Sequence, residues 1–136
     1  MMKRFIKILM VCLAAAVVSV SCGPSREERA RTAADEFLTA YYSMDFASAA
    51  ALCTPSCAAL IEQSVSDMAS LPEYVLGKMK EASSETSYEI VSVDAESVDG
   101  LAVIYYKVSA PGLFKPLEKT LRLKIEGRTA LVDAVE

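Results

Sequence analysis

Two hydrophobic periods follow one another along this chain, a helical period up to about residue 83 and an alternating period after it. From residue 26, apolar side chains recur every three or four positions, and Ser25 with Glu28 forms a capping box. Three further helices are predicted: over 45–52, from Pro55 with Thr54 as N-cap, and from Ser70. The side chains expected to face a core are Ala30, Ala34, Phe37, Leu38, Tyr41, Phe46, Ala49, Ala50, Cys57, Leu60, Ile61, Val65, Met68, Val75, Met79 and Ala82.

Four strands are predicted after residue 83, where β-branched and aromatic residues replace alanine. Their ranges are 88–95, 101–109, 117–126 and 129–135. Asp99-Gly100 is a strong hairpin signal, and short connections imply antiparallel neighbours. The third strand alternates most clearly, with Leu117, Leu121, Leu123 and Ile125 on one face and Glu118, Thr120, Arg122, Lys124 and Glu126 on the other. The sequence therefore predicts an α+β domain, with helices packed on one face of a curved four-stranded antiparallel sheet.

The first 22 residues have the organisation of an export signal. Lys3, Arg4 and Lys7 precede an uncharged apolar run over 8–18, which is shorter than the roughly 20 residues of a membrane-spanning helix. The run ends in Ser19-Val20-Ser21-Cys22, which resembles a bacterial lipobox, although Ser19 replaces the favoured leucine. The resemblance implies cleavage before Cys22 and acylation of that residue; ordinary signal cleavage and an uncleaved anchor are the alternatives.

This interpretation divides the chain into a signal peptide over 1–21, a lipidated tether over 22–25 and one domain over 26–136. The expected location is the cell envelope of a Gram-negative bacterium. We expect the outer membrane, because Gly23 is not the aspartate that commonly retains such proteins at the inner membrane.

Composition narrows the possible chemistry. The chain contains no histidine, which excludes Ser-His and Cys-His nucleophiles and histidine metal clusters. Loss of residues 1–21 leaves 11 positive and 18 negative charges, a net charge of −7. That charge opposes nucleic-acid binding and electrostatic attraction to anionic membranes, so the lipid must provide the anchoring. We expect no cofactor and no metal.

Two segments resemble a known superfamily. Residues 34–46, Ala-Asp-Glu-Phe-Leu-Thr-Ala-Tyr-Tyr-Ser-Met-Asp-Phe, and 125–132, Ile-Glu-Gly-Arg-Thr-Ala-Leu-Val, are similar to the first helix and the last hairpin of nuclear transport factor 2-like, cystatin-like proteins. The resemblance covers 30–135 and includes especially the small bacterial lipoproteins of unknown function that share this fold. Thr129 stands where relatives often have an aromatic residue. The resemblance implies a cystatin-like fold.

Two function classes follow, and they differ in what lies between helix and sheet. The first is a non-catalytic binding module for an unknown protein or small ligand, with a homodimer as one form. The second is an enzyme, because superfamily members such as ketosteroid isomerase use an aspartate base and tyrosine donors in that cavity. The residues that supply these side-chain types are Tyr41, Tyr42, Asp45, Tyr105 and Tyr106.

Cys53 and Cys57 are the only cysteines left once Cys12 is removed and Cys22 is acylated. An exported protein meets oxidising conditions, so a disulfide between them is predicted. Two buried free thiols and redox or copper(I) chemistry remain as alternatives.

The connection 110–116 is long for a hairpin and carries two large apolar residues, Leu113 and Phe114. Either they fold back over the open end of the helix–sheet cleft, or they form an exposed tip that docks a partner. In the second case Arg122 and Lys124, with Arg128 nearby, would rim the contact and receive an acidic partner.

Overall fold

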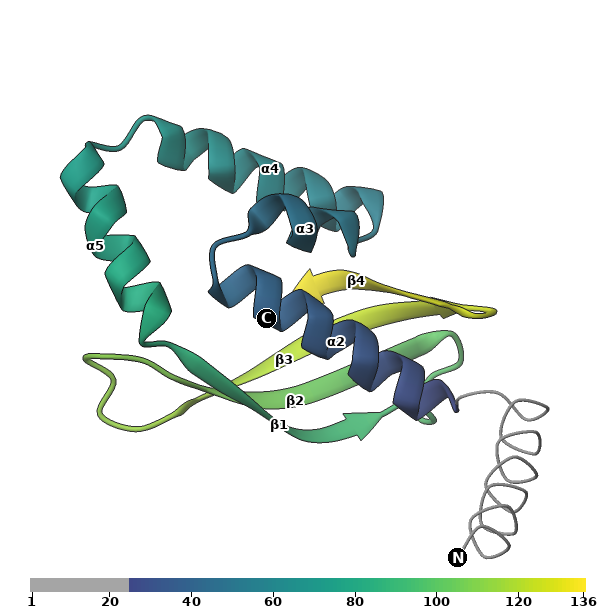
Figure 1. The fold of residues 1–136 in the computed structure, drawn as a ribbon. Helices are drawn as coiled ribbons and strands as arrows, with labels where there is room; N and C mark the ends of the chain where they lie inside the picture. Colours follow the sequence, from purple (N-terminus) through teal and green to yellow (C-terminus); the bar gives the residue numbers. More distant parts are fainter. Residues whose placement is uncertain (1–24) are drawn as a thin grey trace, which may run out of the picture.

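The computed structural model describes residues 25–136 as four helices followed by four strands (Figure 1). The predicted leader and Cys22 lie outside the described residues. The elements are α2 (Arg26–Tyr42), α3 (Phe46–Ala51), α4 (Pro55–Ala69), α5 (Glu73–Ser84), β1 (Ser87–Asp94), β2 (Leu101–Ser109), β3 (Leu117–Glu126) and β4 (Thr129–Val135). The predicted α+β class is confirmed.

The sheet is an open antiparallel meander in the order β1-β2-β3-β4, as the short connections predicted. Gly100 ends the β1–β2 turn with a positive φ of 75°, a conformation that favours glycine. The alternation predicted for β3 is confirmed for Leu121, Leu123 and Ile125, which are buried, whereas Leu117 is half exposed. Two β-bulges interrupt the pairing: Val91 is the extra residue in β1, and Asp133 is the extra residue in β4.

The core lies between α2 and one face of the sheet. Helix α2 contacts all four strands and buries Ala30, Ala34, Phe37 and Leu38 completely. Opposite it lie the largest buried side chains of the sheet, which are Ile104, Tyr106, Leu121, Leu123 and Val132. Burial of each such side chain contributes roughly 1.5–3 kcal/mol, so this interface dominates the stability of the domain.

The other helices form a second layer rather than covering the sheet. Helix α3 packs on α2 and on α4. Helix α4 also contacts the sheet, at β4, whereas α3 makes no substantial contact with a strand (Figure 1). The segment between α3 and α4 pairs with the outer edge of β4, because Thr54 N donates to Val132 O and Val132 N donates to Leu52 O, at 2.8 and 2.9 Å. This connection therefore covers an edge that would otherwise be open for pairing.

Two predictions about helix ends are confirmed and one is wrong. Ser25 Oγ accepts from Glu28 N at 3.1 Å, and Thr54 is the N-cap before Pro55. Ser70, however, ends α4, and α5 begins at Glu73 with Pro72 as its N-cap. The proline fixes the start of the helix, and the turn before it belongs to the preceding helix.

The predicted core faces of α4 and α5 are only partly correct. In α4, Cys57 and Ile61 are buried, but Leu60 and Val65 are exposed. Helix α5 buries no residue: Val75 and Met79 are half-buried and Ala82 is exposed. Figure 1 shows the reason, since α5 descends beside the sheet rather than across its face.

Two phenylalanine substitutions test whether the interface between α2 and the sheet provides most of the stability. We expect Phe37→Ala to lower the free energy of unfolding by about 3–5 kcal/mol, because it leaves a cavity under α2. Phe114→Ala should change it by no more than about 0.5 kcal/mol, because Phe114 is fully exposed. Urea unfolding of both variants is the measurement, and equal losses would contradict the described core.

Candidate functional site

The connection between β2 and β3 forms an exposed apolar tip. Phe114 is fully exposed, Leu113 is 43% exposed, and Leu117 at the start of β3 is 50% exposed. The turn is closed by a hydrogen bond from Leu113 N to Ala110 O at 3.1 Å. Leu113 and Phe114 therefore do not fold back over the core, and of the two expected arrangements the structure has the exposed one. We call residues 110–117 the apolar tip.

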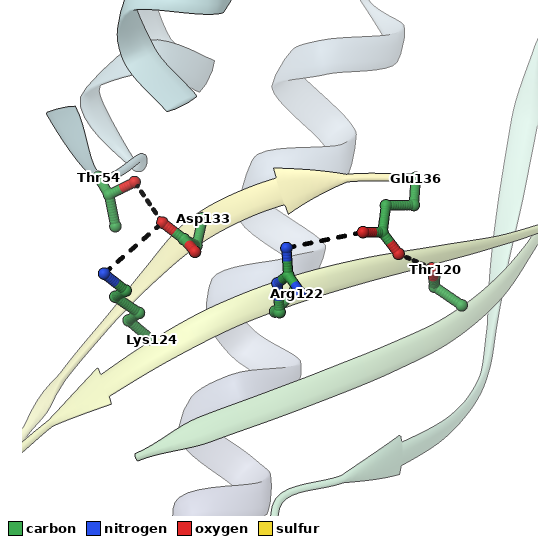
Figure 2. A network of polar contacts seen from close by, with 6 residues as sticks. All are labelled: Thr54, Thr120, Arg122, Lys124, Asp133 and Glu136. Atoms are coloured by element: carbon green, nitrogen blue, oxygen red, sulfur yellow. Dashed lines mark hydrogen bonds and ion pairs between the residues drawn. The ribbon is translucent and has the colours of Figure 1, made fainter. Parts of the chain in front are cut away.

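Arg122 and Lys124 lie on the outer face of β3, and both are paired with carboxylates of the same chain (Figure 2). An Arg122 guanidinium nitrogen lies 3.6 Å from Glu136 Oε1, and Lys124 Nζ lies 4.0 Å from Asp133 Oδ1. The other Glu136 oxygen accepts from Thr120 Oγ1 at 3.3 Å. These ion pairs are partly exposed, so each contributes at most about 1 kcal/mol to stability. They offset the two positive charges but do not hold the side chains rigidly in place.

The predicted rim of positive charge around the apolar tip is not assembled. Lys124 lies near the end of β3, and Arg128 lies in the β3–β4 turn, at the opposite end of that strand from residues 110–117. A strand of ten residues spans about 33 Å, so neither side chain reaches the tip. Arg122 lies midway.

The sequence pattern did not predict a role for Asp133, the bulge residue of β4. Its carboxylate accepts from Thr54 Oγ1 at 2.9 Å and so joins the start of α4 to β4 (Figure 2). The register shift gives this side chain access to both Thr54 and Lys124. Only the observed pairing shows it, because a bulge breaks the alternation by one residue and leaves the composition unchanged.

The five candidate cavity residues come together only in part: Tyr41, Tyr42 and Tyr106 lie near one another, whereas Asp45 and Tyr105 are exposed. Tyr41 lines an apolar groove between α4, α5 and β4, and Tyr42 lines a polar cleft beside β1. Tyr105 lies on the outer face of the sheet, whereas Tyr106 next to it points inward. Asp45 is exposed and accepts from Ser48 N, so that it caps α3. The arrangement that the enzymatic alternative requires, an aspartate facing tyrosine donors, is not made by these residues.

Tyr41, Tyr42 and Tyr106 influence one another, and the ring centroids of Tyr41 and Tyr42 lie 5.2 Å apart. Burial raises the pKa of the Tyr42 and Tyr106 phenols, the hydroxyl of Tyr42 raises the pKa of Tyr106 further, and Tyr41 raises both. The Tyr106 hydroxyl is buried and makes no hydrogen bond of normal geometry in the described chain. Both phenols therefore stay protonated at neutral pH.

Cys53 and Cys57 lie together under β4, where both are buried. The two sulfurs are not bonded in the structure; Cys57 Sγ donates to Cys53 Sγ at 3.1 Å, and Cys53 Sγ donates to Ala49 O at 3.3 Å. Burial raises the pKa of the Cys53 thiol, and the neighbouring Cys57 raises it further, so the reduced form is a poor nucleophile. A covalent bond requires an approach of only about 1 Å, so the disulfide stays a prediction that the geometry permits.

Comparisons with models of known protein families, with curated proteins and with solved structures found no match. Across residues 25–136, no helix has the length and hydropathy needed to cross a bilayer. Within the same range, no group of three or more His, Cys, Asp or Glu side chains is arranged to hold a metal ion.

The cysteine pair makes a prediction about the exported protein. After denaturation without reductant it should show no free thiol, and after reduction it should show two, because Cys53 and Cys57 are close enough to pair. Thiol titration is the measurement. Replacing both residues by alanine should lower the free energy of unfolding by about 2 kcal/mol, because the unfolded chain regains the entropy that so short a disulfide loop removes. Two thiols per chain before reduction would show that the pair is core filling.

Proposed function

We propose that the protein is an exported, lipid-anchored, non-catalytic binding module that presents its apolar tip to another protein. The proposal includes signal cleavage before Cys22, acylation of that residue, and placement in the outer membrane. It also includes a cystatin-like assignment, which is supported by one long helix lying across a four-stranded antiparallel meander.

The proposal places the apolar tip at the end of the domain farthest from the lipid anchor, and the positions of the two ends support this orientation. Arg26, at the start of α2, lies 3.6 Å from Asp99 of the β1–β2 turn, so the tether would enter at the end where that turn lies. A tether of four residues can span at most about 14 Å, so the proposed anchor at Cys22 would hold this end close to the membrane. The apolar tip follows Ser109, which pairs with Ser87 at the other end of the same strands. The tip therefore points away from the tether by the length of the sheet (Figure 1).

The observation that carries the proposal is the complete exposure of Phe114 on a hairpin connection that contains a hydrogen-bonded turn. Large apolar side chains that gather at one exposed place commonly mark a protein interface. Because β2 and β3 are paired up to Val108 and Leu117, next to the tip, the ends of the connection are held in place and lose little conformational entropy on binding.

Charge favours a particular kind of partner. Residues 107–119 contain three lysines, Lys107, Lys115 and Lys119, and one acidic residue, Glu118, within a domain whose net charge is −7. A protein with an apolar pocket and an acidic rim would match both properties of the tip. This local excess replaces Arg122 and Lys124 as the expected source of attraction.

Lipidation is tested on the mature N-terminus. We expect mass spectrometry to find Cys22 as the first residue, carrying acyl chains, and Cys22→Ser to release the protein from the membrane fraction. A mature chain that begins elsewhere, or one that is soluble in its native form, would contradict the anchor.

Docking by the tip is tested with a photo-reactive phenylalanine analogue in place of Phe114. We expect a discrete adduct in intact cells, and none when the analogue replaces Val98, which is similarly apolar and exposed but lies in the β1–β2 turn. Leu113→Ser with Phe114→Ser should abolish the association and leave the thermal unfolding midpoint unchanged.

An adduct of twice the monomer mass would identify the partner as a second copy and overturn the proposed acidic protein. An adduct pattern that is the same at both positions would show that the tip is not a specific contact.

A further inference from the structure

A concave site lies at the same end of the domain as the apolar tip, between α2, α5 and the start of β1. This cleft has a volume of about 500 Å³, within the range of small-molecule sites. Eight of its eleven lining residues carry a hydroxyl group, which distinguishes it from the apolar groove between α4, α5 and β4. We call it the hydroxyl cleft.

Half of these eight hydroxyl groups already donate a hydrogen bond to a backbone carbonyl. Ser43 donates to a backbone carbonyl of α2, and Ser84 and Thr86 donate to backbone carbonyls of α5, each at 2.7 Å, while Ser83 donates to Tyr42 O. Their oxygens can therefore only accept further hydrogen bonds. A matching ligand must supply several donors.

Two tyrosine rings complete the cleft. The rings of Tyr42 and Tyr88 are nearly parallel, with centroids 6.3 Å apart and an interplanar angle of 29°. The Tyr88 hydroxyl donates to Asp35 Oδ1 and lies 2.8 Å from Thr39 Oγ1, which fixes the ring on β1 against α2. The rings offer apolar surface, which C–H groups of a ligand can cover, beside the hydroxyl acceptors.

The charge of the cleft excludes other ligand classes. Lys80 is the only charged residue in its lining, so no carboxylate is present there to hold a metal ion or a polyamine. A single lysine also supplies too few donors for a phosphate site of the usual kind. A neutral molecule with several hydroxyl groups and an apolar face remains.

A strained residue lies in the same cleft. Met44, which lines it, has a φ of 63° at the end of α2, where helices usually have glycine or asparagine. Asp45 N donates to Ala40 O at 2.9 Å and Met44 N donates to Tyr41 O at 3.2 Å, which is a Schellman ending. The left-handed conformation costs a side chain about 1–2 kcal/mol, and glycine would avoid this cost. Strain of this kind is often retained where a side chain contributes to binding.

From these observations we propose that the hydroxyl cleft binds a neutral saccharide ring. The sugar hydroxyls donate to the serine and threonine oxygens, its apolar face packs on Tyr42 and Tyr88, and the Met44 side chain closes one side. This site is separate from the apolar tip, and the proposal does not depend on the proposed function.

The test uses nuclear magnetic resonance of the whole protein with isotope-labelled tyrosine, in a detergent without a sugar headgroup. The chain has six tyrosines and no tryptophan, so the ring signals are few. Glucose, galactose, N-acetylglucosamine and maltose are titrated separately, and spermidine and inorganic phosphate represent the other classes. We expect at least one sugar to shift Tyr42 and Tyr88 saturably, while the exposed rings of Tyr74 and Tyr105 serve as internal controls.

Two variants make the test specific. Ser84→Trp fills the cleft from the exposed end of α5 and should weaken sugar binding more than about tenfold, whereas Ser66→Trp, on the exposed side of α4, should not. Met44→Gly should weaken binding several-fold while raising the unfolding midpoint, a combination that a purely structural role would not produce.

The proposal is overturned if none of the four sugars shifts Tyr42 and Tyr88, or if Tyr74 and Tyr105 shift equally. It is also overturned if spermidine or phosphate alone binds. Sugar binding that is unchanged in both Ser84→Trp and Met44→Gly would place the ligand elsewhere and equally refute the site.

Discussion

The contact between α2 and the inner face of the sheet is the interaction on which the rest of the structure depends. Ala30 and Ala34 let the first half of the helix approach the strands closely, and Phe37 and Leu38 fill the space opposite Ile104 and the leucines of β3. A single helix thereby buries the inner face of all four strands. Because this one interface supplies most of the apolar burial, α5 and the connection 110–116 are free to lie outside it.

An open sheet also has two edges that must not pair with other chains. The edge of β4 is covered by residues 52–54, which places Cys53 and Cys57 against the strand and positions Thr54 beside Asp133. The β1 strand is interrupted by the bulge at Val91 and carries Glu89. Bulges and charges are common protections of edge strands. The same devices that guard the edges therefore also position the cysteine pair and the bulge carboxylate.

The sequence predicted most of the secondary structure because its local signals were strong. The first predicted strand is shifted by one residue and the other three have the predicted bounds, since alternation, Asp99-Gly100 and Gly127 define the turns. It did not predict that α5 would lie away from the core, because a helical stripe shows that a face is apolar but not that a partner covers it.

The candidate sites were harder to predict for a related reason. The pairing of Tyr42 with Tyr88, and of Thr54 with Asp133, joins residues that are far apart in the chain. The predicted rim of Arg122, Lys124 and Arg128 failed because nearness in sequence along a strand becomes distance in space. Side-chain chemistry was visible in the sequence, but the convergence of side chains from different elements was not.

The features to which we assign proposed binding roles lie at one end of the molecule. The pairing of Ser87 with Ser109 places the start of β1, and hence the hydroxyl cleft, at the end of the sheet from which the apolar tip extends. The strained Met44 lies at the same end, since it follows the C-terminal turn of α2. The opposite end, where Arg26 meets Asp99, holds the β1–β2 and β3–β4 turns. The proposed tether enters at the opposite end from the exposed Phe114, the hydroxyl cleft and the strained Met44, and this asymmetry suits the proposed binding away from the membrane.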